Sequence, residues 1–328
     1  MSERKTQTVS FEFAGERLDM FIWRQFEELS RSKIQEGIVR GHVLVNGKRE
    51  KKSYCLREND EISTDDEKIW EENSRNLMII PQEMQLNILW EDENYVAVCK
   101  TSGLTVHPAW GQKDGTLLNG LYHYADCASP TYTPKLVHRL DKDTSGVIIS
   151  AKNENAHEKL AEKFAAREIY KKYFGICIGK FPDAMSGTME FPIGRDKKDP
   201  VKRAIDYHHG RDARTDYEVL LYAHGIYFNS YRLHTGRTHQ IRIHCSNSGF
   251  PIICDSLYGG SKERIKGLEQ RDRPFAISVY DCFKRHALHA RNLGFRHPFT
   301  QEEIFLTAPF PEDFQKAIEL LEISEVLL

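Results

Sequence analysis

The sequence lacks the features of exported and membrane-spanning proteins. Its first ten residues, MSERKTQTVS, contain no apolar core of the kind found in secretion signals. No stretch approaches the roughly 20 uninterrupted apolar residues of a transmembrane helix. We therefore expect a cytoplasmic protein without membrane contacts.

Paired cysteines are also missing. The seven cysteines stand singly, without a Cys-X-X-Cys pair, which favours reduced thiols over a disulfide framework or a zinc site. His244, Cys245 and Cys254 could in principle approach one metal ion, but their spacing fits no familiar ligand pattern. The spacing therefore predicts no metal site. We also expect no cofactor.

An overall excess of either charge is absent too, since 46 basic residues face 48 acidic ones. The local distribution is uneven. Residues 31–57 contain eight Lys or Arg and two acids, whereas residues 58–72 contain eight acids and one lysine. Phosphates respond to the local field rather than to the net charge, so the basic segment is a candidate RNA-binding surface. A merely solvated basic face would give the same pattern.

The first 60 residues predict two helices and a hairpin. Apolar residues recur every three or four positions over 16–29 and again from residue 34 to Gly41. Asn46 and Gly47 then form a pair typical of a two-residue hairpin turn, where both residues need a positive φ. A chain of 328 residues favours two domains, and the acidic segment reads as a linker. We expect the domains at residues 1–75 and 76–328.

This stretch resembles the small alpha-L RNA-binding module named after ribosomal protein S-four. The resemblance lies in RLDMFI, in LSRSKIQEGIVRGHVLVNG and in a closing strand near residues 60–62. It implies that the second helix and the hairpin grip the RNA backbone, where phosphate contacts position the protein without reading sequence. The cations expected to make these contacts are Arg31, Lys33, Arg40, Lys48 and Arg49.

The sequence HRLDKDTSG, residues 138–146, lies between two short apolar segments. Leu136 and Val137 precede it and residues 147–149 follow it, which predicts buried strands on either side of a tight loop. Asp141 then lies on a loop held by rigid neighbours, where scaffolds commonly place chemistry. Taken alone, the string favours the simpler interpretation of a turn whose aspartate caps its own backbone.

Two further stretches carry candidate functional side chains. The alternation in YKKYFGICIG, residues 170–179, predicts a strand in which Tyr173 points away from Phe174. In YFNSYRLHTGRTHQIRIH, residues 227–244, a strand is expected to end near residue 236. The segment after it carries Arg237, His239, Arg242 and His244. His239 and Arg242 share a face only if a helix starts there, and the periodicity leaves helix and strand open.

Five motifs in order resemble the pseudouridine synthases of the RluA/RluD type. They are HRLDKDTSG, REIYKKYFGICIG, LHTGRTHQIRIH, PIICDSLYGG and LHARNLGFRHPFT, within a similarity over about residues 85–312. Thr101 stands where many relatives have Pro in a KPxG turn, and Cys254 where Gly is usual before Asp255. The resemblance implies that the alpha-L module is followed in sequence by a catalytic domain with an α+β fold. This domain has a mixed, largely antiparallel sheet and a central cleft.

The resemblance also assigns roles to residues. Asp141 becomes the catalytic carboxylate and Arg242 its ion-pair partner. Tyr173 becomes an aromatic that stacks on the target base and a candidate for assisting proton removal. Arg139 becomes the side chain that enters the stack vacated by the base.

The chemistry of these residue types fits that assignment. Converting uridine to pseudouridine breaks the C1′–N1 bond and joins C5 to C1′, which needs an ionised carboxylate near the anomeric carbon. An adjacent guanidinium favours the ionised form. Asp141 could attack C1′ or remove a ribose proton, and the sequence leaves both routes open.

We therefore expect a monomeric enzyme that isomerises specific uridines in structured RNA. Large-subunit (23S) ribosomal RNA is the expected substrate, with transfer RNA as the alternative. Two other functions compete with this hypothesis: a non-catalytic RNA-binding or ribosome-assembly factor, and an RNA N-glycosylase that releases the base.

Overall fold

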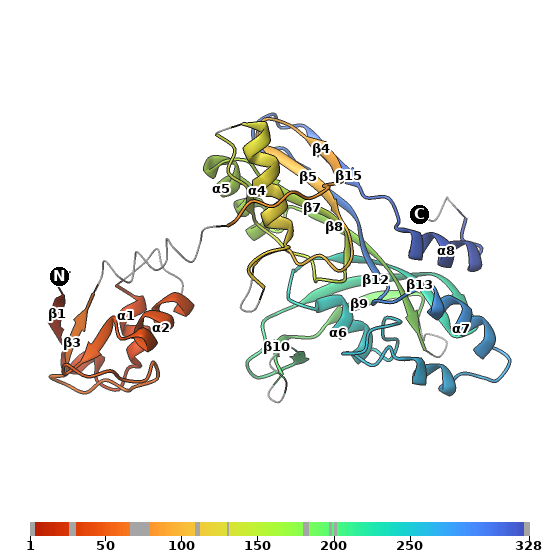
Figure 1. Cartoon of the computed structure of the whole chain (residues 1–328). Helices are drawn as coiled ribbons and strands as arrows, with labels where there is room; N and C mark the ends of the chain where they lie inside the picture. The colour runs from red at the N-terminus through yellow and green to blue at the C-terminus, as the bar shows by residue number, and fades with distance from the viewer. Residues whose placement is uncertain are drawn as a thin grey trace. The chain divides into compact units, whose positions relative to one another are not determined.

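The chain folds as two units, residues 1–78 and 79–328 (Figure 1). The computed structural model describes residues 4–25, 31–65, 79–108, 112–129, 131–179, 184–196, 199 and 202–324. Within these ranges, no helix combines the length and the apolar character that crossing a membrane requires.

The first unit is a small α+β module. Its strands β1 (Lys5–Thr8), β3 (Glu61–Thr64) and β2 (Val43–Val45) form an antiparallel sheet in that order. The 3-10 helix η1 (Phe11–Phe13), α1 (Leu18–Trp23) and α2 (Arg31–Arg40) complete it. The core side chains are almost fully buried and come from both helices and the sheet: Leu18, Ile22, Ile34, Ile38, Val43 and Ile62.

The predicted helices and turn are present in this unit. The helix expected over 16–29 is observed as α1, while Phe26 and Leu29 lie outside the described residues. Asn46 and Gly47 both have positive φ, 49° and 73°. The predicted hairpin is wrong beyond that turn, because only Val45 and Lys48 bridge across it. Strand β2 pairs instead with β3, which the acidic segment supplies.

The second unit is built on one large mixed sheet. The strands in chain order are β4 (Ile88–Glu91), β5 (Tyr95–Lys100), β6 (Lys135–Leu136), β7 (Ser145–Ala151), β8 (Tyr170–Ile178), β9 (Ser186–Glu190), β12 (Arg214–Ala223), β13 (Ile226–Leu233), β14 (Leu288–Arg296) and β15 (Glu303–Thr307). They run in the order β4-β5-β7-β14-β8-β13-β12-β9, with β6 paired to β7 and β15 to β14. Among the described strands every pair in this sheet is antiparallel except β7 with β14, which confirms a mixed, largely antiparallel sheet.

Helices cover both faces of this sheet. They are α4 (Leu117–Ala128), α5 (Glu154–Ala165), α6 (Gln240–Asn247), α7 (Arg273–Asp281) and α8 (Glu312–Leu320), with a 3-10 helix η2 (Lys262–Gly267) and a small ribbon of β10 (Ile193–Arg195) and β11 (Arg203–Ile205). Alternation along β7 separates the two faces, since Ile148 belongs to the cluster that contains α4 whereas Val147 and Ile149 belong to the cluster that contains α5. Figure 1 places α4 and α5 beside β5 and β7, and α6 and α7 at the end of the sheet formed by β12 and β13.

The one parallel pairing decides where the loop of residues 137–144 lies. Strand β14 pairs with β7 only near its start, through His289 with Ser145 and Ala290 with Gly146. From Asn292 onward it pairs with β15. Gly146 has a φ of +121°, and a Cβ atom there would lie 2.1 Å from the carbonyl oxygen of Ala290. Only glycine therefore allows β14 to approach the first residues of β7.

Substituting Gly146→Ala should lower the free energy of unfolding by about 2 kcal/mol or more, because backbone strain and a backbone clash combine. Chemical denaturation of the full chain measures the loss. The matched control is Gly267→Ala, at an exposed position with open space around the new methyl group. Equal stability of the two variants would contradict the close approach of β7 and β14.

Candidate active site

The loop of residues 137–144 is anchored by buried polar side chains. Lys100, 1% exposed, donates from Nζ to the carbonyl oxygen of Lys142 over 2.9 Å, and also to those of Thr101 and Leu104. Arg285 donates from Nη1 to the carbonyl oxygen of Asp143 over 2.9 Å. These two side chains donate hydrogen bonds to backbone carbonyl oxygens that a tight turn would otherwise leave unsatisfied.

Two histidines from the segment before and inside β14 fix the end of the loop. His286 Nε2 lies 2.8 Å from Oγ1 of Thr144, and His289 Nδ1 lies 2.9 Å from Oγ of Ser145. Burial lowers the pKa of His286 to about 2 and that of His289 to about 3. Both rings are therefore neutral at neutral pH, and the loop is held by hydrogen bonds without added positive charge.

Arg242 lies between two aspartates. Its Nε and Nη2 donate to Oδ2 and Oδ1 of Asp255, over 2.6 and 2.9 Å, while Nη1 donates to Oδ2 of Asp141 over 3.1 Å. Burial opposes the charged form of Arg242, but the hydrogen bonds and charges of both aspartates outweigh it and raise the pKa. The guanidinium is therefore a permanent cation at this position.

The arrangement differs from the simple pair expected from the sequence. The guanidinium donates two hydrogen bonds to Asp255, from Nε and Nη2. Asp141 therefore accepts a single hydrogen bond, on Oδ2. Within the described residues, Oδ1 of Asp141 accepts no hydrogen bond. That oxygen is free to meet a reacting atom, while Oδ2 holds the carboxylate in place.

The four residues that the resemblance selected line one small cavity. Arg139, Asp141, Tyr173 and Arg242 all border a space of about 80 Å³. It adjoins a cavity of about 530 Å³, because the two share Arg139 and Tyr173 along with Leu233, Gly236 and Arg237. Residue 240 begins helix α6, so the ambiguity between helix and strand resolves to a helix that carries Arg242 to Asp141.

Tyr173 is a neutral phenol in this setting. The residue is 8% exposed, and burial together with the charge of Asp141 raises its pKa. A hydroxyl that keeps its proton at neutral pH is a poor base. The environment therefore favours a stacking role over the removal of a proton.

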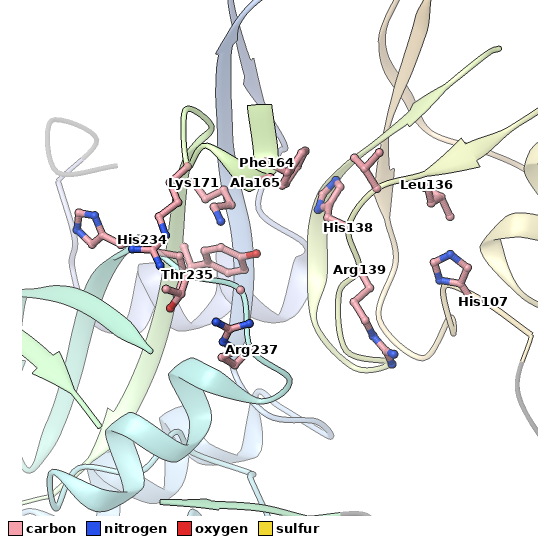
Figure 2. A pocket seen from close by; sticks show the side chains of 15 residues that line it. His107, Leu136, His138, Arg139, Phe164, Ala165, Lys171, His234, Thr235 and Arg237 are labelled. Carbon is pink, nitrogen blue, oxygen red and sulfur yellow. The ribbon is translucent and has the colours of Figure 1, made fainter. Parts of the chain in front are cut away.

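The larger cavity concentrates positive charge. Its lining contains Arg139, Arg167, Lys171 and Arg237 and no acidic residue within the described chain. Burial lowers the pKa of Lys171 and the charge of Arg167 lowers it further, while burial and the charges of Arg211 and Arg167 lower that of Arg237. Cations that oppose one another's charge in this way suit a polyanion. Figure 2 shows Arg139 on one wall and Lys171 and Arg237 on the other.

The basic residues of the first unit divide by their partners. Asp19 is fully buried and binds Arg31 at 2.8 Å as well as Arg17 at 2.9 Å, so Arg31 holds α1 against α2 in addition to any RNA contact. Arg40 pairs with Glu36 at 2.6 Å. Lys48 and Arg49 are exposed beside the turn, and the side chain of Lys33 lies outside the described part of the chain.

Sequence reasoning assigned no role to Asp255, Lys100 or Arg285. Asp255 follows Cys254, whose φ is +59°, a conformation that favours glycine, and this explains physically why Gly is usual there in the similar family. The acid inside PIICDSLYGG was the available signal, but its partner Arg242 is on a different motif.

Replacing Asp255→Asn should destabilise the protein by about 3 kcal/mol, because it removes the bidentate partner of a buried cation. Thermal denaturation measures this. The control is Asp281→Asn, which breaks an exposed pair with Lys262 at 2.8 Å and should cost less than about 1 kcal/mol. Similar losses of stability in both variants would mean that the buried pair of Asp255 with Arg242 stabilises the protein no more than an exposed ion pair does.

Comparisons with known proteins agree with this architecture. Residues 94–247 match the family model described as RNA pseudouridylate synthase, and residues 16–62 match the S4 domain. The chain is 37% identical over 322 residues to a ribosomal large subunit pseudouridine synthase D of Pseudomonas aeruginosa, covering 97% of this chain and 96% of that protein. It is 39% identical over 311 residues to an uncharacterized RNA pseudouridine synthase of Chlorobaculum parvum, covering 92% and 93%.

A solved structure gives the same result. Human RNA pseudouridylate synthase domain containing 4 superposes with a TM-score of 0.53 at 26% sequence identity, over 72% of this chain and 93% of that one. Because the relatives are similar over almost their whole length, both the S4 domain and the sheet with its loop of residues 137–144 fall within the shared region.

Proposed function

The chain belongs to the RNA pseudouridylate synthase family, and from that premise we propose that Asp141 is the carboxylate that converts uridine to pseudouridine in large-subunit ribosomal RNA. The enzyme class is that of an RNA pseudouridine synthase, an isomerase. The single observation that carries the residue assignment is the asymmetric contact of Asp141. One oxygen is held by Arg242 at 3.1 Å and the other accepts no hydrogen bond within the described chain.

This asymmetry fits both chemical routes. In one, Oδ1 attacks C1′ as the C1′–N1 bond breaks, and it departs when C5 of the turned uracil bonds to C1′. In the other, the carboxylate removes a ribose proton and later returns one. In both, C5 loses its proton and N1 gains one, so no outside oxidant or energy source is required. A carboxylate held on one oxygen by a buried guanidinium, with its other oxygen open to the cavity, suits either step.

Base extrusion is the second part of the proposal. A uridine within structured RNA must leave its stack before its C1′ can reach Asp141, at a cost of a few kcal/mol. Arg139 is exposed, borders both cavities and makes no ion pair with any described residue. It is therefore available to fill the vacated space. Tyr173 also lines the small cavity and would offer the ring on which the extruded base stacks.

The substrate class is supported by three features together. The chain carries an S4 domain, its larger cavity is lined with cations, and a relative that matches over most of both chains is named as a ribosomal large subunit enzyme. Cations along the cavity would neutralise the phosphates on both sides of the extruded nucleotide.

Asp141→Asn should reduce tritium release from RNA containing 5-tritiated uridine to background, because the amide cannot replace an ionised carboxylate. Melting temperature and RNA affinity should change little. Asp143→Asn is the matched control, since it makes the same change two positions away at a carboxylate without a described ion pair, and it should retain most of the activity. Product analysis separates pseudouridine from free uracil, and turnover near the wild-type rate would remove Asp141 from its role.

In the first unit, Lys48→Gln combined with Arg49→Gln should weaken binding to ribosomal RNA and lower the slope of log Kd against log salt by about 1 to 2. The control is Lys262→Gln combined with Lys316→Gln, which removes the same charge from exposed lysines of the second unit. Filter binding at several salt concentrations measures both. An unchanged slope in the first variant would exclude these residues from phosphate contacts.

A further inference from the structure

His239 adopts a strained backbone conformation beside the proposed catalytic carboxylate. It is the N-cap residue of α6, with φ of 59° and ψ of 19°, in the left-handed region that non-glycine residues rarely enter. Such strain persists where the surrounding structure imposes it, and it concentrates at functional sites. Its side chain lines the small cavity together with Asp141, Tyr173 and Arg242.

Hydrogen bonds assign the proton on the imidazole. The hydroxyl of Tyr258 accepts from the backbone N–H of Arg203 over 2.9 Å and lies 2.8 Å from Nδ1 of His239. Burial raises the pKa of Tyr258, so its hydroxyl keeps its proton. The N–H of Arg203 already occupies one acceptor position of that hydroxyl, which favours the arrangement in which the hydroxyl donates to Nδ1. Burial lowers the pKa of His239 despite the opposing charge of Asp141, so the ring is neutral. A neutral ring that accepts at Nδ1 carries its proton on Nε2.

The Nε2–H group has no acceptor within the described chain. Its nearest candidate is Oδ2 of Asp141 at 4.0 Å, which exceeds a hydrogen-bond distance. The side chain is 13% exposed and lines the small cavity, so this donor can be reached from the cavity. The group therefore presents a donor to whatever enters the cavity next to Asp141.

The position of Asp141 limits which substrate oxygen can meet this donor. On either chemical route Asp141 faces C1′ of the target nucleotide or the carbon next to it, so the ribose lies beside the carboxylate. The 2′-hydroxyl is attached to the carbon adjacent to C1′, and it is the group that distinguishes RNA from DNA. We propose that His239 is a positioning residue that donates its Nε2–H to the 2′-hydroxyl of the extruded uridine.

Tyr258 acts through His239 in this proposal. By donating to Nδ1 it excludes the other tautomer, in which Nε2 would be an acceptor without a proton. Arg203, whose backbone donates to Tyr258, lies on β11. In this proposal, the backbone of β11 orients the hydroxyl of Tyr258, which in turn determines which nitrogen of His239 carries the proton. The proposal rests on Asp141 being the reacting carboxylate.

The test is a binding cycle in an inert background. Two synthetic RNA stem-loops contain the uridine that the wild-type enzyme modifies, one with ribose and the other with 2′-deoxyribose at that single position. The Kd of each is measured for full-length Asp141→Asn, for Asp141→Asn with His239→Asn, and for Asp141→Asn with Tyr258→Phe. Asparagine tolerates the left-handed backbone, so His239→Asn removes the imidazole without adding strain.

Asp141→Asn should bind the ribose stem-loop about 5- to 10-fold more tightly than the deoxyribose one, as expected for one hydrogen bond. Adding His239→Asn should bring the two affinities to within about 2-fold, and Tyr258→Phe should give an intermediate ratio. A merely structural His239 would weaken both RNAs equally and leave their ratio unchanged, which would overturn the proposal. No discrimination by Asp141→Asn itself would overturn it as well.

Failure of the proposed function has a different signature. If Asp141→Asn alone retained pseudouridine formation on the ribose stem-loop, the catalytic assignment would fall whatever the binding ratios. If that variant is inactive but the ratios do not respond to His239, only the assignment of the 2′-hydroxyl contact fails.

Discussion

The contact of one guanidinium with two aspartates is the interaction on which the rest of the site depends. Arg242 lies on α6 and binds Asp255 with two N–H groups and Asp141 with one. A buried cation needs anionic partners, and a buried anion needs a cation, so the helix and the loop of residues 137–144 hold each other. Because Asp255 satisfies most of the guanidinium, Arg242 stays in place without occupying both oxygens of Asp141. Under the proposed function, Asp255 would orient the guanidinium and Asp141 would react.

The surroundings of this contact hold the loop through several buried polar side chains. Lys100 and Arg285 bind backbone carbonyls of the loop, while neutral His286 binds the hydroxyl of Thr144 and neutral His289 that of Ser145 at the start of β7. If the proposed function holds, these contacts would position Asp141 before RNA binds, which lowers the reorganisation that the reaction requires. Among the described residues that line it, the larger cavity has cations and no acids. Under the proposed function, the larger cavity would bind the RNA backbone and the smaller one would hold the reacting nucleotide.

Much of the fold could be predicted from the chain, and the omissions share one physical cause. Short apolar segments on either side of residues 138–146 predicted β6 and β7, and the alternation over residues 170–178 predicted β8. No pattern predicted α4 or β14. Strand β14 is buried on both faces and includes His289, Arg291 and Asn292, so it shows no polar alternation. A segment whose polar groups are satisfied by distant partners does not look like a core strand until those partners are known.

The sequence by itself determined the local elements, the positions of the motifs and, through their resemblance, the candidate residues that line the small cavity. These follow from short-range periodicity and from residue chemistry, which the chain carries at each position. Only the tertiary structure decided that the guanidinium face binds Asp255, that Oδ1 of Asp141 stays open and that the Nε2–H of His239 faces the same space. Those facts depend on groups up to 101 positions apart, as in the pair of Asp141 with Arg242. Their geometry is set by how β7, β14 and α6 pack, which no local pattern records.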